Sequence, residues 1–314
     1  MRLVTRSDFD GLACAVLLEE LGLITAYRFV HPKDVQDGLV EVDGNDVLAN
    51  IPYVPGCGMW FDHHSSERIR FDRDSIVPMF PGARVQGESR PAPSCARVIY
   101  DYFGGAKKFG RYDDSGLMAA VDRSDSADFT IEEVLNPRGW VLLSFIMDAR
   151  TGLGLTRDYN ISNLELMGRM ITYCRTRSVE EILNAPDVGE RVERYFSQEA
   201  SFREMLLANS RTEDNVIVID LREVREIQSG NRFVEYALFP DQNVSLRTFW
   251  GKARGNVVFT VGHSIFNKTC RTDVGALMLD YGGGGHERVG TCQAAVADAD
   301  RVFSELLAAL KKNG

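Results

Sequence analysis

The first 62 residues alternate short β-prone stretches with helical ones, and this alternation limits the fold more than any other feature of the sequence. The β-prone stretches are Met1–Arg6, Ala26–His31, Asp46–Asn50 and Gly58–Phe61, and the apolar segment Leu12–Gly22 has helical spacing. Strands that alternate with helices predict a parallel sheet. Polar residues after these strands should then meet at one edge, where open α/β sheets bind ligands. We therefore expect an α/β fold.

The length of the chain and a later change of pattern predict two domains. The 314 residues are more than one hydrophobic core usually fills. The stretch from Cys95 to about Ala208 is mostly helical, and the apolar run Val216–Asp220 starts a β-rich pattern. We expect a first α/β domain at residues 1–186, a linker helix at 187–212 and a smaller α/β domain at 213–314.

Composition excludes several classes of protein. Apolar residues make up 44% and charged residues 26%, as in ordinary globular proteins. No apolar run approaches the ~20 residues that cross a bilayer, and Asp8 and Asp10 fall where a signal peptide would be apolar. The six cysteines form no C-x-x-C pair, which argues against a zinc knuckle and a disulfide framework. We expect a cytoplasmic protein that binds no membrane.

The net charge of −9 argues against a long nucleic-acid duplex as the partner, because such binding depends on many Lys and Arg contacts to phosphates. A small phosphorylated ligand is compatible with this charge. It would need local positive charge or backbone N–H groups at its binding site. The sequence also leaves a homodimer open.

Two acidic motifs follow β-prone stretches in the first domain. In SDFDG, Asp8 and Asp10 can point toward one hard divalent cation, and Gly11 lets the backbone bend into the helix. A turn with a helix cap explains the same motif. The triplet Asp62–His64 follows the apolar GMWF, and imidazole with carboxylate suits Mn, Fe, Co or Zn better than Ca. One structural histidine with an exposed neighbour is the alternative there.

Two further motifs are candidates for ligand contacts. The run Gly282–Gly285, followed by His286 and Arg288, allows backbone N–H groups to form an anion nest. A flexible linker would also be glycine-rich, but the flanking VGALMLDY and VGTCQAAVA are apolar. Asp122 and Asp125 follow LMAAV, which fits a strand or a buried helix. Asp122 is either a metal ligand or a surface cap.

The motifs, taken in their order along the chain, resemble those of the DHH phosphoesterase superfamily with its DHH-associated C-terminal domain. They are SDFDG, DVLANIP, FDHH, AAVDRSD and the distal GGGGH, and the resemblance covers nearly the whole chain. It implies a parallel α/β domain joined by a linker to a smaller α/β domain, with the active site in the cleft between them. It also implies metal-dependent hydrolysis of phosphoesters, for which most members use two Mn²⁺ ions.

The resemblance implies a role for each motif residue. The residues that would bind Mn²⁺, or another divalent metal, are Asp8, Asp10, Asn50, His63 and Asp122. The residues that would support catalysis and contact the substrate beside the metal are Asp62 and His64. The residues that would bind the substrate are Arg6, Arg271, Gly283, Gly284, Gly285, His286 and Arg288.

Two positions depart from the family pattern. Many relatives have a His where this chain has Arg6, and an Asp that bridges the metals where this chain has Asn50, although Asp46 is close enough for another alignment. A guanidinium removes a ligand and adds positive charge, and a neutral amide cannot offset a second dication. We therefore expect one tightly bound Mn²⁺, at Asp10 and His63, and a second that binds weakly.

Three functions fit these motifs. The first is a metal-dependent phosphoesterase that hydrolyses small nucleotides, short oligonucleotides or cyclic dinucleotides. The second is an exopolyphosphatase. The third is a catalytically weakened nucleotide- or phosphate-binding protein, which Arg6 and Asn50 favour. The family's inorganic pyrophosphatases have a different second domain, so the run GGGGH argues against them.

Overall fold

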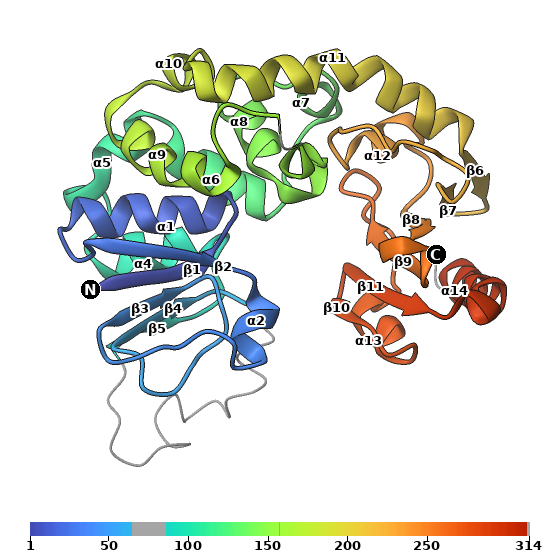
Figure 1. Cartoon of the computed structure of the whole chain (residues 1–314), viewed down its shortest axis with the longest axis horizontal. Helices are drawn as coiled ribbons and strands as arrows, with labels where there is room; N and C mark the ends of the chain where they lie inside the picture. The colour runs from blue at the N-terminus through green and yellow to red at the C-terminus, as the bar shows by residue number, and fades with distance from the viewer. Residues whose placement is uncertain (65–85, 157, 313–314) are drawn as a thin grey trace. The chain divides into compact units, whose positions relative to one another are not determined.

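The computed structural model describes residues 1–64, 86–156 and 158–312, and these form two compact units (Figure 1). The first unit comprises residues 1–128, 138–149 and 153–193, and the second comprises 129–137, 150–152 and 194–314. The main change of unit falls inside helix α11 (Pro186–Ala208), between the predicted boundaries at 186 and 212. The short segments 129–137 and 150–152 belong to the second unit, although we expected them in the first domain.

A five-stranded parallel sheet forms the centre of the first unit, which confirms the prediction from the alternating pattern (Figure 1). The strands, in the order in which they lie side by side, are β2 (Ala26–Val30), β1 (Arg2–Arg6), β3 (Asp46–Ala49), β4 (Met59–Asp62) and β5 (Gln86–Ser89). Every neighbouring pair is parallel. The residues that follow β1, β3 and β4 therefore lie at one edge of the sheet.

The two faces of this sheet enter two different cores, because successive side chains of a strand point in opposite directions. The face toward the helices carries Leu3, Val47, Ala49, Met59 and Phe61. The opposite face carries Val4, Leu48 and Trp60, which pack with Val35 of α2 (Pro32–Gln36). Helix α1 (Phe9–Glu20) is buried from Phe9 to Leu18, since it lies between the sheet and further helices.

Several helices complete the first unit. They are α4 (Cys95–Tyr102), α5 (Ala106–Asp114), α6 (Leu117–Asp125), α8 (Gly139–Met147), α9 (Asn163–Thr176), α10 (Val179–Leu183) and the 3₁₀ turn η2 (Leu153–Leu155). Helix α1 contacts α4, α6 and α9. The segment LMAAV, for which the sequence left strand and helix open, is part of helix α6.

A six-stranded mixed sheet forms the second unit. The strands, in order, are β10 (Gly284–His286), β11 (Val289–Ala294), β9 (Val257–His263), β8 (Val244–Trp250), β7 (Val216–Asp220) and β6 (Ser210–Glu213). Strands β7 and β8 pair in parallel, and the other neighbours are antiparallel. One face packs against α13 (Val274–Leu279) and α14 (Ala299–Lys312).

The remaining short helices are α7 (Ile131–Leu135), α12 (Val234–Leu238), η1 (Ala149–Thr151), η3 (Lys252–Arg254) and η4 (Val296–Asp298). Within the described ranges, every helix is too short or too polar to cross a membrane. The fold class predicted from the sequence, a parallel-sheet α/β domain followed by a second α/β domain, is confirmed.

Gly11 of the SDFDG motif allows α1 to start close to the end of β1. A Cβ atom at this position would lie 2.0 Å from the carbonyl oxygen of Arg6. We expect Gly11→Ala to lower the free energy of unfolding by about 1–3 kcal/mol, because the helix must move away from the strand. Urea titration followed by circular dichroism measures this change.

The matched control is Gly110→Ala in helix α5. A Cβ atom there meets nothing within 4 Å. Alanine has a better helix propensity than glycine, so this variant should gain about 0.5–1 kcal/mol. A Gly11→Ala variant as stable as Gly110→Ala would contradict the role given to Gly11.

Candidate metal centre

Asp8 and Asp10 lie where β1 passes into α1. The strand ends at Arg6 and the helix begins at Phe9, with Asp8 as the N-cap. The Oδ1 atom of Asp8 accepts the N–H of Gly11 at 2.9 Å. Asp10 sits in the first turn of the helix and is 2% exposed. In this motif Asp8 therefore caps the helix, and Asp10 contributes a buried carboxylate.

The N-terminus of α4 holds the carboxylate of Asp10. The N–H of Cys95 donates to Oδ2 and the N–H of Ala96 to Oδ1, both at 2.8 Å. Helix N-termini stabilise negative charge in this way. Burial still raises the pKa of Asp10 well above its usual value, and the nearby Asp125 and Asp8 raise it further against the two N–H groups. A bound cation would offset this excess of negative charge.

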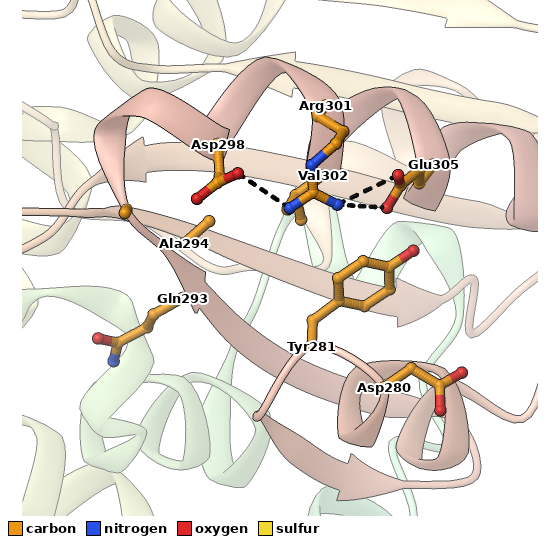
Figure 2. A pocket seen from close by; sticks show the side chains of 9 residues that line it. Asp280, Tyr281, Gln293, Ala294, Asp298, Arg301, Val302 and Glu305 are labelled. Carbon is orange, nitrogen blue, oxygen red and sulfur yellow. Dashed lines mark hydrogen bonds and ion pairs between the residues drawn. The ribbon is translucent and has the colours of Figure 1, made fainter.

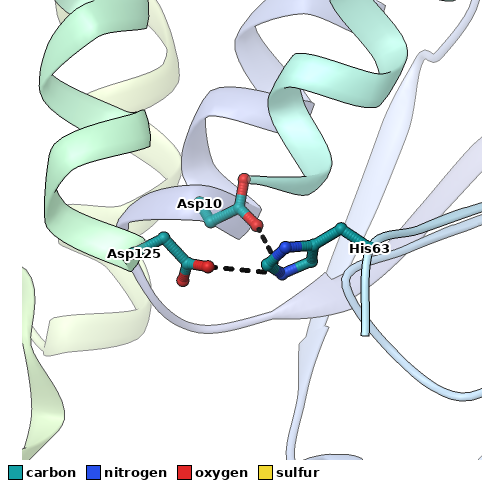
Figure 3. A group of neighbouring side chains, drawn as sticks. All are labelled: Asp10, His63 and Asp125. Carbon is teal, nitrogen blue, oxygen red and sulfur yellow. Dashed lines mark ion pairs between the residues drawn. The ribbon is translucent and has the colours of Figure 1, made fainter. Parts of the chain in front are cut away.

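His63, directly after β4, faces two carboxylates (Figure 3). Its Nδ1 lies 3.2 Å from the carbonyl oxygen of Ala92, and because that oxygen can only accept, Nδ1 carries a proton. Its Nε2 is buried without a hydrogen-bond partner among the described residues. This nitrogen lies 3.3 Å from Oδ2 of Asp125 and 3.8 Å from Oδ2 of Asp10.

Asp10, His63 and Asp125 fit a divalent metal ion. One ligand atom from each residue lies within 4.8 Å of the others. An imidazole lone pair would repel two carboxylates at this distance unless a positive charge lay between them. Two carboxylate oxygens and one imidazole nitrogen suit a first-row transition metal, and the bond from Nδ1 to a carbonyl fixes the ring as in many metal sites.

Asp125, rather than the predicted ligand Asp122, is the residue of α6 that joins this cluster. Asp122 accepts a hydrogen bond from Oγ of Ser94 at 2.7 Å. It also accepts two from Arg97, at 2.9 Å from Nε and 2.6 Å from Nη2. Both oxygens of the Asp122 carboxylate are therefore already paired. The side chain of Asp125 is 31% exposed and directed toward His63.

Asp62 and His64, the predicted catalytic pair, are joined to each other. Asp62 is fully buried at the end of β4, and its Oδ1 lies 2.8 Å from Nδ1 of His64. Burial disfavours the charged imidazole, but the hydrogen bond to Asp62 and the negative charges of Asp62, Asp125 and Asp10 together outweigh it and raise the pKa of His64 to about 9. The two histidine rings lie 4.4 Å apart. His64 is therefore fixed beside His63, a member of the cluster that fits a metal ion.

Arg6 and Asn50, the two departures from the family pattern, both contact Asp8. Nε of Arg6 lies 2.9 Å from Oδ2 of Asp8, and Nδ2 of Asn50 donates to Oδ1 at 3.0 Å. Asp8 is not one of the three residues of the cluster formed by Asp10, His63 and Asp125. The structure thus brings Asp8, Arg6 and Asn50 together as a network next to that cluster.

The glycine run of the second unit differs from the predicted open anion nest. Gly282 has φ +71°, and the N–H of Gly283 donates to the carbonyl oxygen of Met278 at 2.9 Å. The N–H of Gly282 donates to Leu279 at 3.0 Å, which completes a Schellman motif at the end of α13. The N–H of Gly283 is thus already used. Gly284–His286 form the edge strand β10.

Three predicted substrate-binding side chains, Arg271, His286 and Arg288, are exposed. His263 contacts the backbone at Arg288 and at Thr272, the residue after Arg271. Its N–H donates to the carbonyl oxygen of Arg288 at 2.9 Å, and its Nε2 lies 2.9 Å from the carbonyl oxygen of Thr272. Arg271 and Arg288 are therefore close to each other at the end of β9.

A pocket of about 500 Å³ lies elsewhere in the second unit, beside α14 (Figure 2). Arg301 lines this pocket and forms ion pairs with Asp298 at 3.0 Å and with Glu305 at 3.1 Å. Tyr281 lines the opposite side. No residue predicted to bind substrate lines this pocket. Its only arginine is already neutralised by two carboxylates, so it offers little attraction to a phosphate.

The chain is similar over its whole length to the solved structure of a pGpG-specific phosphodiesterase, PggH from Vibrio cholerae. The identity is 46%, the TM-score is 0.84, and the match covers 100% of this chain and 99% of PggH. A DHH-domain protein described as a member of the S1p family of ribosomal proteins shares 13% identity and a TM-score of 0.62, over 99% of this chain and 87% of its own. An exopolyphosphatase-related protein from Bacteroides fragilis has 14% identity and a TM-score of 0.50, and the match covers 99% of this chain and 91% of that protein. No protein-family model and no curated protein matches the chain.

The fold and the carboxylate–imidazole cluster define a metal-dependent phosphoesterase. The 46% identity to a phosphodiesterase over the full length agrees with this class. The two more distant structures show the same fold. The chain belongs to the DHH phosphoesterase superfamily, as the order of its motifs predicted.

Two contributions to the centre were missed in the sequence. The sequence pointed to Asp122, whereas Asp125 lies in the cluster with Asp10 and His63. The N–H groups of Cys95 and Ala96 at the start of α4, which bind Asp10, were not predicted. A signal for this helix start exists, because Ser94 follows Pro93 and precedes an apolar helical run, which is typical of an N-cap.

Asp125→Asn and Asp122→Asn distinguish the two candidate ligands. We expect Asp125→Asn to weaken Mn²⁺ binding at least about tenfold, because a charged ligand is lost. Asp122→Asn should bind Mn²⁺ nearly as the unmodified protein does, since its carboxylate pairs with Arg97. Isothermal titration with Mn²⁺ measures both. A larger loss of Mn²⁺ affinity in Asp122→Asn than in Asp125→Asn would favour Asp122 as the ligand.

Proposed function

We propose that this enzyme hydrolyses pGpG, or a closely related linear dinucleotide, to mononucleotides with Mn²⁺ at Asp10, His63 and Asp125. The observation that carries the proposal is the cluster of these three residues within 4.8 Å, on a chain 46% identical to a pGpG-specific phosphodiesterase. In the reaction one water molecule attacks phosphorus and the bond to the 3′ oxygen breaks. Each molecule of pGpG then yields two molecules of GMP.

The residues around the cluster support this chemistry. A divalent ion at the cluster would supply positive charge for the phosphoryl oxygens and activate a water molecule. His64, held by the buried Asp62 at 2.8 Å, would donate a hydrogen bond to the phosphate. Asp62 restrains the imidazole, so this contact needs little reorganisation when substrate binds.

Charge supports a small substrate. The net charge of −9 opposes a long duplex, whereas the exposed Arg271 and Arg288 and the neighbouring His286 suit one or two phosphates. We propose these three side chains as phosphate contacts in the second unit. A cytoplasmic location and the absence of duplex binding remain predictions from the sequence.

The alternatives have weaker support. The similarity to an exopolyphosphatase-related protein, at 14% identity, concerns the fold alone. Short oligonucleotides and cyclic dinucleotides contain the same phosphodiester bond as pGpG and are therefore comparison substrates. A binding protein without turnover would keep the contacts to phosphate but would leave the Asp10, His63 and Asp125 cluster without a role.

A substrate panel tests the proposal. Purified protein with Mn²⁺ should convert pGpG to GMP with a kcat/KM at least about tenfold above that for pAp, longer oligonucleotides, cyclic di-GMP and polyphosphate. Chromatography of the products measures each reaction. A preference for polyphosphate, or binding of pGpG without cleavage, would refute the assignment.

Arg288→Gln tests the phosphate contacts of the second unit. We expect KM for pGpG to rise at least about tenfold with a smaller change in kcat, because a charge-assisted hydrogen bond to the phosphate is lost. The matched control is Arg301→Gln, which removes an exposed arginine from the pocket of Figure 2 and should leave KM unchanged. Equal KM values in the two variants would remove Arg288 from the substrate site.

A further inference from the structure

Both oxygens of Asp8 already have partners, and one of these partners is a guanidinium. Oδ1 accepts hydrogen bonds from the N–H of Gly11 at 2.9 Å and from Nδ2 of Asn50 at 3.0 Å. Oδ2 pairs with Nε of Arg6 at 2.9 Å. A metal ion at Asp8 would have to displace a guanidinium that carries its own positive charge.

Asn50 is fixed in the position where it contacts Asp8. It follows β3 with φ +56°, a left-handed conformation that Asn tolerates better than most residues. Its N–H donates to the carbonyl oxygen of Phe61 at 3.2 Å and lies 3.2 Å from Sγ of Cys95. Its amide group donates to Asp8 and so offers no negative charge that could join two cations.

The charges of the centre balance with one dication. Asp8, Asp10 and Asp125 carry three negative charges when ionised, and oxygens of Asp10 and Asp125 lie 3.8 Å and 3.3 Å from Nε2 of His63. One divalent ion and the guanidinium of Arg6 supply three positive charges. A second divalent ion would leave two positive charges in excess, at separations where like charges repel strongly.

Arg6 also has donors to spare. Its side chain is 40% exposed at the carboxyl end of β1, and in the described ranges its ion pair with Asp8 uses Nε. The two terminal nitrogens of a guanidinium can bind two oxygens of a phosphate.

We propose that this centre binds a single divalent ion, at Asp10, His63 and Asp125, and that Arg6, fixed on Asp8, takes the place of a second ion as a permanent cation that contacts the substrate phosphate. The inference rests on the proposed metal centre. It departs from the two Mn²⁺ ions that the family resemblance implies, because the residues around Asp8 do not fit a second ion.

Counting bound ions tests the proposal without any substrate. Mn²⁺ is titrated into metal-free protein, and the free ion is measured by electron paramagnetic resonance. We expect one ion per chain to bind tightly, with a second at least about a hundredfold weaker. Two ions of similar affinity would overturn the proposal. Since no nucleotide is present, this result is independent of whether pGpG is the substrate.

The double variant Arg6→His with Asn50→Asp should convert the centre to two ions. It removes the resident cation and adds an imidazole and a carboxylate beside Asp8, so the titration should show two tight ions per chain. The matched control is Arg28→His, the same replacement at an exposed position of the neighbouring strand β2, which should still bind one. Thermal unfolding checks that the variants are folded. One tight ion in the folded double variant would overturn the proposal.

The contact between Arg6 and the substrate is tested by kinetics. Arg6→Gln should raise KM for pGpG at least about tenfold, and Arg6→Lys, which keeps the charge, should raise it less. Unchanged KM in Arg6→Gln would overturn this part of the proposal. If pGpG is not hydrolysed by the unmodified protein, the proposed function fails, while the count of bound ions still decides whether Arg6 replaces a metal.

Discussion

The bond between Asp10 and the start of helix α4 is the interaction on which the metal centre depends. Two backbone N–H groups, of Cys95 and Ala96, bind the two oxygens of a carboxylate that belongs to α1. This contact joins residues 85 positions apart in the sequence and sets the position of α1 against α4. It also aims one oxygen toward His63. Asp10 therefore connects two helices of the first unit and also belongs to the cluster with His63 and Asp125, so its replacement would disturb the packing as well as the cluster.

Much of the fold was accessible from the sequence because the relevant signals are local. The strand Val216–Asp220 was predicted with its observed bounds, and β3 was predicted to within one residue. The parallel sheet followed from the alternation of these strands with helices, and its carboxyl edge brought Asp8, Asp10 and His63 into the right region. These features depend on the periodicity of apolar residues and on chain direction, both of which a sequence displays.

The rest depended on partners that are distant in sequence. Asp122 and Asp125 are three positions apart in the last turns of α6, and the sequence does not show which one Arg97 of α4 binds. Likewise, the glycine run is visible in the sequence, but its use depends on where α13 ends. That helix ends at Leu279, and the N–H groups of Gly282 and Gly283 bind carbonyl oxygens of its last turn. These two glycines therefore form the turn that ends the helix.

The residues that set the charge of the centre lie at the ends of the strands, with Arg6 as the last residue of β1. Asn50 follows the last residue of β3, and Asp8 follows β1 by two positions, so changes there leave the buried strands β3 and β4 intact. Packing and chemistry are thus carried by separate sets of side chains at this edge. A scaffold of this kind can acquire or lose an ion through one or two substitutions while its core stays the same. With a single ion as proposed, the number of metals in this centre depends on the side chains at positions 6 and 50 rather than on the fold.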